Sequence, residues 1–143
     1  MIESRTFICT TVEQTRQLGR DIAAACSDRA LISLRGSLGA GKTVIAKGIA
    51  EAIGITDAIV SPTFTLIQEY AGSIPLQHMD LYRIDGVEEF DGIGGEELLY
   101  QKGITLIEWS EKIDEILPDD TIYIDIEILD NQDRRITVKG LAL

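Results

Sequence analysis

The fold of this 143-residue chain is decided by one glycine-rich stretch, Gly36-Ser37-Leu38-Gly39-Ala40-Gly41-Lys42-Thr43. An apolar run, Leu31-Ile32-Ser33-Leu34, leads into it, and apolar residues recur at helical spacing from Ile45 to Ile53 behind it. The order is therefore strand, glycine loop and helix. The stretch has the pattern G-x-x-x-x-G-K-[ST], which is typical of a loop that cradles the phosphates of a nucleotide.

Each fixed position of this loop has a physical role in holding phosphate. Glycines reach positive φ angles, so that successive N–H groups turn toward an anion. The helix that begins here adds free N–H groups and the positive end of its dipole. Lys42 can reach the β- and γ-phosphates, and the Thr43 hydroxyl can complete the coordination shell of Mg2+. The residues predicted to bind a magnesium nucleotide are Gly36, Leu38, Gly39, Ala40, Gly41, Lys42 and Thr43.

Composition predicts a single globular domain over residues 1–143. A chain of this length buries about two-thirds of its unfolded surface. The sequence has no stretch of about 18 apolar residues, as a membrane span requires, and no basic segment followed by an apolar run, as a secretory signal requires. We therefore expect a cytoplasmic protein without a membrane segment. Its two cysteines, Cys9 and Cys26, are expected to be reduced and buried.

Negative charge is concentrated in the second half of the chain. The formal net charge is -11; residues 1–79 carry seven acidic and seven basic side chains, whereas residues 80–143 carry seventeen and six. An acidic half repels a phosphate backbone, so we expect no autonomous binding to RNA or DNA. It is either a solvated surface or a docking face for a basic protein partner.

Two carboxylates stand where apolar strands are predicted to end. The run 104–107 ends in Glu108, which is the Walker B arrangement that holds Mg2+ near the phosphates. Asp80 follows the apolar strand 74–79 in the same way. We favour Glu108 for Mg2+, because its strand is of the more completely buried type. Asp80 is then the group that orients the attacking water or senses the γ-phosphate.

Two hydroxyl residues have two interpretations each. Thr11 stands between a strand at 6–9 and a helix that runs to about Ala25, where Thr10 and Glu13 resemble a capping box. It either contacts a nucleotide base or only caps that helix. Thr63 lies in the bend Ser61-Pro62-Thr63-Phe64 behind a short strand at 58–60. It either contacts the γ-phosphate or the metal, as switch segments do, or belongs to a structural turn.

Four larger side chains also have two interpretations. His78, the only histidine, is expected to be a hydrogen-bonded structural group. Trp109 is interpreted as a packing residue, with contact to the nucleotide or a partner as the alternative. Arg134 and Arg135 are either solvated strand ends or groups that reach an adenine or phosphate edge.

The remaining segments predict strands and short helices. Residues 66–79 predict two strands joined by a tight turn, and residues 86–100 predict short helices joined through glycines. A short helix is expected over 110–117. The strict alternation over 122–128 predicts a strand with one buried and one solvated face, and 134–139 returns antiparallel to it.

Four segments together resemble one known family, the bacterial ATPase of tRNA threonylcarbamoyladenosine biosynthesis, called TsaE or YjeE. They are the glycine loop 36–43, Ser61-Pro62-Thr63-Phe64-Thr65-Leu66, His78-Met79-Asp80-Leu81-Tyr82-Arg83 and Leu106-Ile107-Glu108-Trp109. They occur in the family's order and spacing, and the resemblance covers nearly the whole chain. The glycine loop is generic, whereas the second and third segments are much more specific. Residues 86–100 depart most from the family pattern.

The resemblance implies an α/β fold of the P-loop NTPase type, with three layers and a mixed sheet flanked by helices, here with a C-terminal antiparallel hairpin. It implies ATP hydrolysis with Mg2+ that is slow in the isolated protein. The implied partners, TsaB and TsaD, transfer the threonylcarbamoyl group to A37 of tRNA, and the ATPase resets that complex between cycles. By the resemblance, Lys42 binds phosphate, Thr43 and Glu108 hold Mg2+, and Asp80 and Thr63 lie near the γ-phosphate.

Two other classes of function stay open at this point. A small-metabolite kinase of this build would add a lid with arginines that clamp the transferred phosphoryl group, but Arg83 is the sole arginine between Lys47 and Arg134. A nucleotide-gated binding module, in which ATP orders residues 61–65 for a partner, has the same loop motif. Nothing resembles the Asn-Lys-x-Asp motif of guanine-specific proteins, which favours ATP over GTP.

Overall fold

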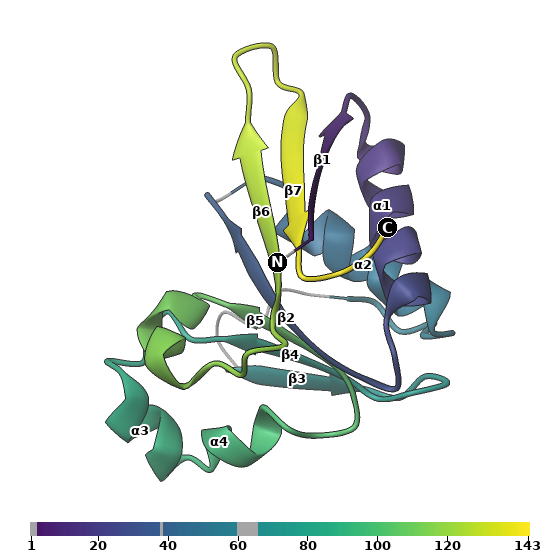
Figure 1. Cartoon of the computed structure of the whole chain (residues 1–143). Helices are drawn as coiled ribbons and strands as arrows, with labels where there is room; N and C mark the ends of the chain where they lie inside the picture. Colours follow the sequence, from purple (N-terminus) through teal and green to yellow (C-terminus); the bar gives the residue numbers. More distant parts are fainter. Residues whose placement is uncertain (1–2, 38, 60–65) are drawn as a thin grey trace.

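The computed structural model describes residues 3–37, 39–59 and 66–143 (Figure 1). Seven strands form one sheet. They are β1 Ser4–Cys9, β2 Arg29–Gly36, β3 Ile67–Tyr70, β4 Leu76–Asp80, β5 Gly103–Glu108, β6 Ile122–Ile128 and β7 Arg134–Lys139. The helices are α1 Val12–Ala25, α2 Lys42–Ala52, α3 Val87–Gly92, α4 Gly95–Leu98 and the 3-10 helix η1 Ser110–Ile116.

The sheet is mixed, as the resemblance implied. Its strand order is β1-β7-β6-β2-β5-β4-β3. The four strands at its centre, β6, β2, β5 and β4, are parallel to one another, whereas β7, β1 and β3 add antiparallel pairs at the two edges. The predicted C-terminal hairpin is confirmed, because β6 and β7 pair antiparallel from Tyr123 opposite Lys139 to Ile128 opposite Arg134.

Helices cover both faces of the sheet, which confirms the three-layer prediction. Alternate residues of β2 point to opposite faces, as strand geometry requires. Ile32 belongs to a buried cluster with Ile22 of α1 and with residues of α2, whereas Leu31 belongs to a second cluster with Phe90 of α3 and residues of η1. Figure 1 shows α1 and α2 side by side, away from α3 and α4. The helix that follows the glycine loop is therefore fixed between α1 and the parallel strands.

Two glycines let α1 and α2 approach closely. A Cβ atom at Gly48 of α2 would collide with the backbone carbonyl of Arg16, and one at Gly19 of α1 would lie 2.5 Å from the carbonyl oxygen of Ile45. Beside this contact, Arg20 of α1 donates a 2.9 Å hydrogen bond to Glu51 of α2, and Arg16 pairs with the same carboxylate. The backbone contact therefore sets the position of α2.

The predicted capping box of α1 is wrong by one residue. Thr11, with extended φ and ψ of -134° and 158°, is the N-cap, and its Oγ1 accepts a 3.1 Å hydrogen bond from the N–H of Gln14. The Gln14 Oε1 atom in turn accepts a 2.7 Å hydrogen bond from the N–H of Thr10. Glu13 instead pairs with Arg20. Adjacent threonines offer two caps, and the chain turns only after the second.

Other local predictions have mixed outcomes. The strand expected over 58–60 is not present at 58–59, and residues 60–65, with Thr63, lie outside the described residues. The link between β3 and β4 takes residues 71–75 and is longer than the predicted tight turn. Both cysteines are free thiols, and burial raises the pKa of Cys26 to about 11. In the part of the chain that the structure describes, no helix has the length and apolar character needed to cross a bilayer.

The close contact of α1 and α2 predicts an unusual cost for a helix-favouring substitution. Gly48→Ala should lower the free energy of unfolding by about 1–3 kcal/mol, because the added methyl group forces the two backbones apart. Gly92→Ala is the matched control, since no atom of the described residues lies within 4 Å of a Cβ atom there, and it should change the stability by less than about 0.5 kcal/mol. Urea unfolding measures both. Equal stability of the two variants would contradict the close-contact account.

Candidate nucleotide-binding site

The glycine loop lies between the end of β2 and the start of α2, at the centre of the sheet. Gly39 and Gly41 have φ angles of 80° and 110°, in the left-handed region that strains other residues. Gly41 is also the N-cap of α2, and among the described residues no side chain caps the helix there. A helix N-terminus without a side-chain cap is the arrangement that suits a bound anion.

A cavity of about 820 Å3 opens at this loop. Its size is within the range of small-molecule sites, which is about 300–1,000 Å3. Asp80 and Glu108 line it together with the predicted loop residues Gly36, Gly39, Gly41, Lys42 and Thr43. Ala40 is fully buried behind it, and Leu38 and Thr63 lie outside the described residues. Three lining residues, Ser37, Val44 and Tyr82, were not among the predicted site residues, and Trp109 was predicted there only as an alternative to packing.

The two predicted carboxylates meet because their strands are parallel neighbours. Asp80 ends β4 and Glu108 ends β5, and the two residues are register partners. The strand β5 pairs on its other side with β2, which leads into the glycine loop. Parallel strands bring their carboxyl ends to one edge of a sheet, where α/β proteins bind ligands. Strand order thus places both acids beside Lys42.

Glu108 is held by two nitrogen groups in a nearly dry environment. Its Oε1 atom lies 3.3 Å from Lys42 Nζ, and its Oε2 atom lies 2.8 Å from His78 Nε2. Only 8% of the Glu108 side chain and 1% of the His78 side chain are exposed. Burial alone would raise the pKa of Glu108, but the hydrogen bond from His78 and the charge of Lys42 outweigh burial and lower that pKa. The carboxylate is therefore ionised.

Asp80 is fixed by the backbone of its own strand end. Its Oδ1 atom accepts a 2.9 Å hydrogen bond from the N–H of Tyr82, two residues later. Asp80 is only 8% exposed, although it lines the cavity. A local bond of this kind holds the carboxylate without help from a distant residue.

Trp109 and Tyr82 form an aromatic wall of the cavity. Their ring centroids are 4.9 Å apart, and Lys42 Nζ lies 5.9 Å from the centroid of the Trp109 ring. Trp109 has a φ of 62°, uncommon for a residue other than glycine, and is 39% exposed. Trp109 lines the cavity, and its contact with a nucleotide or a partner stays a prediction. Its position directly after a strand-end carboxylate is the sequence signal for this role.

Arg134 contacts the glycine loop across the fold. Its Nε atom donates a 3.0 Å hydrogen bond to the carbonyl of Ala40, and its Nη2 atom lies 3.4 Å from the carbonyl oxygen of Gly39. In a trans peptide the carbonyl and the following N–H point in opposite directions, so this bond turns the N–H of Gly41 away from Arg134. Arg135 pairs instead with Glu127. Thr11 does not line the cavity, and its contact with a base stays a prediction.

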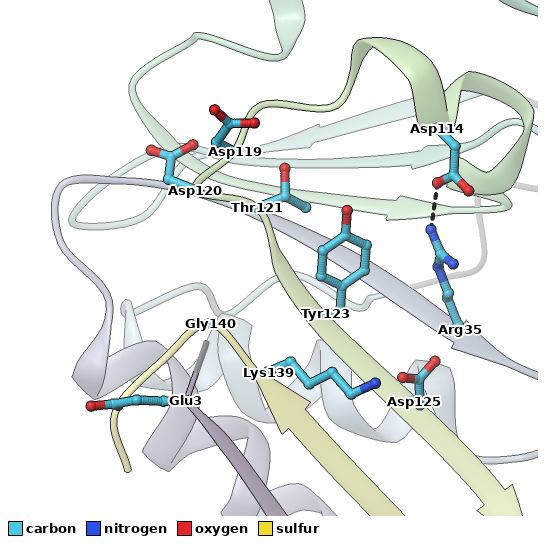
Figure 2. A pocket seen from close by; sticks show the side chains of 10 residues that line it. All are labelled: Glu3, Arg35, Asp114, Asp119, Asp120, Thr121, Tyr123, Asp125, Lys139 and Gly140. Carbon is cyan, nitrogen blue, oxygen red and sulfur yellow. Dashed lines mark hydrogen bonds and ion pairs between the residues drawn. The ribbon is translucent and has the colours of Figure 1, made fainter. Parts of the chain in front are cut away.

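A second groove, of about 880 Å3, lies elsewhere on the sheet (Figure 2). Its charged lining residues are Glu3, Arg35, Asp114, Asp119, Asp120, Asp125 and Lys139. Arg35 donates a 2.7 Å hydrogen bond to Asp114, so one of the two basic groups is already neutralised, as Figure 2 shows. Five carboxylates would repel a polyphosphate. The glycine-loop cavity is therefore the candidate nucleotide site.

Known proteins resemble this chain over most of its length. The family model for threonylcarbamoyl adenosine biosynthesis protein TsaE matches residues 9–136. The tRNA threonylcarbamoyladenosine biosynthesis protein TsaE of Treponema pallidum is 37% identical over 131 residues, or 92% of this chain and 97% of that protein. The protein of the same name from Bacillus subtilis is 40% identical over 131 residues, or 91% and 82%. A crystal structure of Bacillus subtilis YdiB matches 99% of this chain and 88% of its own, with 34% identity and a TM-score of 0.81.

The Arg134 contact predicts a role in ordering the glycine loop. Arg134→Gln should weaken binding of a nucleotide about tenfold, because it removes charge-assisted hydrogen bonds to the loop carbonyls. Arg135→Gln is the matched control, since it removes an adjacent arginine that pairs with Glu127. Fluorescence of Trp109, the only tryptophan, reports binding directly. Equal affinities of the two variants would contradict the role of Arg134.

The environment of Glu108 predicts a pH-dependent contribution to stability. Its pKa in the folded chain is below the ordinary 4.5, so the unfolded state takes up its proton first as the pH falls. The stabilisation is complete above the ordinary pKa of 4.5 and is lost as the pH falls through the lower pKa of the folded chain. The wild type should therefore lose stability on acidification faster than Glu108→Gln, measured by urea unfolding at a series of pH values. Parallel curves would show that this carboxylate has no shifted pKa.

Proposed function

This chain belongs to the TsaE family of threonylcarbamoyl adenosine biosynthesis, and from that premise we propose that it is a Mg2+-dependent ATPase that acts on partner proteins. The observation that carries the proposal is the convergence in one cavity of the glycine loop, Asp80 and Glu108. A binding module needs the loop alone. Hydrolysis also needs carboxylates beside the γ-phosphate, and Asp80 and Glu108 at two strand ends are our candidates for that role.

The residues of the cavity fit a magnesium nucleotide. The uncapped N-terminus of α2 and the ammonium of Lys42 suit phosphate, and the Thr43 hydroxyl and the Glu108 carboxylate are oxygen ligands of the kind that Mg2+ prefers. When bound, Mg2+ supplies neutralisation of charge on the phosphates. Thr43 and Glu108 would hold it. Tyr82 and Trp109 line one side of the cavity as an aromatic wall.

Lys42 must exchange partners when ATP enters. Its ammonium pairs with Glu108 at 3.3 Å, and both side chains are largely buried. The β- and γ-phosphates carry more negative charge and attract the ammonium more strongly. Lys42 would then bind phosphate and leave the Oε1 atom of Glu108 available to hold Mg2+. Asp80, fixed by the N–H of Tyr82, orients the attacking water or senses the γ-phosphate, and we retain Thr63 as a second group for this role.

We propose TsaB and TsaD as the partners, with the ATPase resetting their complex between rounds of A37 modification. Two observations support action through proteins over direct binding to tRNA. Residues 80–143 carry seventeen acidic and six basic side chains, and the groove of Figure 2 is lined mainly by carboxylates. Such a surface repels a phosphate backbone. We also propose a cytoplasmic location, because the proposed partner complex of TsaB and TsaD acts on tRNA.

ATP hydrolysis under multiple turnover, with and without the TsaB and TsaD proteins of the same organism, tests the proposal. We expect slow hydrolysis by the chain alone and faster hydrolysis with both partners. Lys42→Ala and Glu108→Ala should each reduce the rate about 100-fold or more. Lys47→Ala is the matched control, because Lys47 is an exposed lysine on the same helix and should leave the rate unchanged.

Two results would replace the proposal. Tight binding of Mg-ATP without hydrolysis, alone or with the partners, would favour the nucleotide-gated binding module. A phosphorylated small molecule formed from ATP by the chain would favour the metabolite kinase. Normal hydrolysis by both Lys42→Ala and Glu108→Ala would show that the cavity is not the site of catalysis.

A further inference from the structure

His78 is a polar residue in a position that packing alone does not explain. It is 1% exposed, in the strand β4, where the neighbouring residues Leu76 and Met79 are fully buried apolar side chains. A buried imidazole is costly unless its nitrogen atoms are hydrogen-bonded. Its Nδ1 atom has no hydrogen-bond partner among the described residues, and its Nε2 atom bonds to Glu108. The bond to Glu108 is therefore the feature that distinguishes histidine from leucine here.

The strand register places this bond beside the cavity. His78 is the register partner of Leu106 on β5, and Glu108 follows two residues later on the same face. An ionised carboxylate only accepts hydrogen bonds, so the Nε2 atom donates and the 2.8 Å bond fixes the Glu108 Oε2 atom. The imidazole is not among the residues that line the cavity. It acts on a ligand only through Glu108.

The two groups that hold Glu108 differ in how easily they move. Lys42 has four rotatable carbon bonds, stands in the first turn of α2 and lines the cavity. His78 has two rotatable bonds and is enclosed in a central strand of the sheet. If Lys42 leaves for the phosphates, His78 is the group that remains. The carboxylate then keeps one fixed oxygen and offers the other.

We propose that His78 is a positioning residue that holds the Glu108 carboxylate in place for Mg2+ while Lys42 transfers to the nucleotide. The inference rests on the proposed Mg2+-ATP function and adds a residue to it. Partners of this kind, behind a metal ligand, typically change metal affinity by about 10–100-fold when they are removed. His78 therefore belongs to the site even though it does not contact the ligand.

The test measures Mg2+ affinity, with Trp109 fluorescence as the signal. The first titration adds ADP in EDTA, and the second adds Mg2+ at saturating ADP. His78→Leu should lower the Mg2+ affinity of the ADP complex about 10–100-fold, and its affinity for ADP in EDTA should stay within about twofold of the wild type. His78→Gln carries an amide donor at nearly the reach of Nε2 and should recover most of the loss. His78→Asn is polar but too short, and it should not.

Gln77→Leu is the matched control. Gln77 precedes His78, is also buried, and accepts a 3.0 Å hydrogen bond from Thr105 on the opposite face of β4 and β5. Its loss removes a polar contact between the same two strands without touching Glu108. The Mg2+ affinity of this variant should equal that of the wild type. Thermal unfolding of all four variants identifies those that fold. If His78→Leu does not fold, the comparison of His78→Gln with His78→Asn still tests the inference.

The outcomes separate this inference from the proposed function. A wild type that binds ADP equally well with and without Mg2+ would overturn the proposed function, and the inference with it. If the wild type binds ADP more tightly with Mg2+, and His78→Leu or His78→Asn has the same Mg2+ affinity as the wild type, the inference is overturned while the proposed function stands. Equal losses in Gln77→Leu and His78→Leu would also overturn it, because they would indicate a general loosening of the two strands.

Discussion

The parallel pairing of β4 with β5 and of β5 with β2 is the constraint on which the site depends. These pairings bring Asp80, Glu108 and the start of the glycine loop to one edge of the sheet. A slip of one residue in β5 would turn Glu108 to the opposite face, because side chains alternate along a strand. The apolar side chains Leu106 and Ile107, which enter different cores, fix that register. The chemistry of the cavity is thus specified by packing on both faces of the sheet.

Local charge, and not net charge, decides what this chain can bind. Its formal net charge is -11, which would repel a polyphosphate at long range. At physiological salt, however, charges more than about 8 Å apart in water are largely screened. Close to the glycine loop lie Lys42, the N-terminal end of α2 and Arg134, whose guanidinium is bonded to the loop carbonyls. The carboxylates of Glu108 and Asp80 line the same cavity, so the local charge suits an anion that binds together with a cation. An acidic protein can therefore hold an anion in a small, partly dry cavity.

Sequence reasoning could predict the parts of the site that depend on short spacing. The glycine loop, the strand-end acids and the C-terminal hairpin are all local patterns, and the structure has each of them. The partner of His78 was not predictable, because it depends on β4 lying beside β5, which are separated in the chain by α3 and α4. The Arg134 contact joins residues 94 apart in sequence. The capping box placed at Thr10 was wrong because two adjacent threonines fit the same rule, whereas the interpretation of Thr11 as the cap of α1 is confirmed.

The backbone at Trp109 shows how the sheet and η1 together shape the cavity wall. A left-handed conformation costs a residue with a side chain about 1–2 kcal/mol, so it persists only where neighbouring contacts fix it. Directly after Trp109, the Ser110 hydroxyl lies 2.5 Å from that of Ser33 in β2, and Asp114 of η1 accepts a hydrogen bond from Arg35. Arg35 directly precedes Gly36, so the same bonds fasten the start of the glycine loop. The loop and the aromatic wall are thus anchored to one another through η1, and movement of either one strains the other.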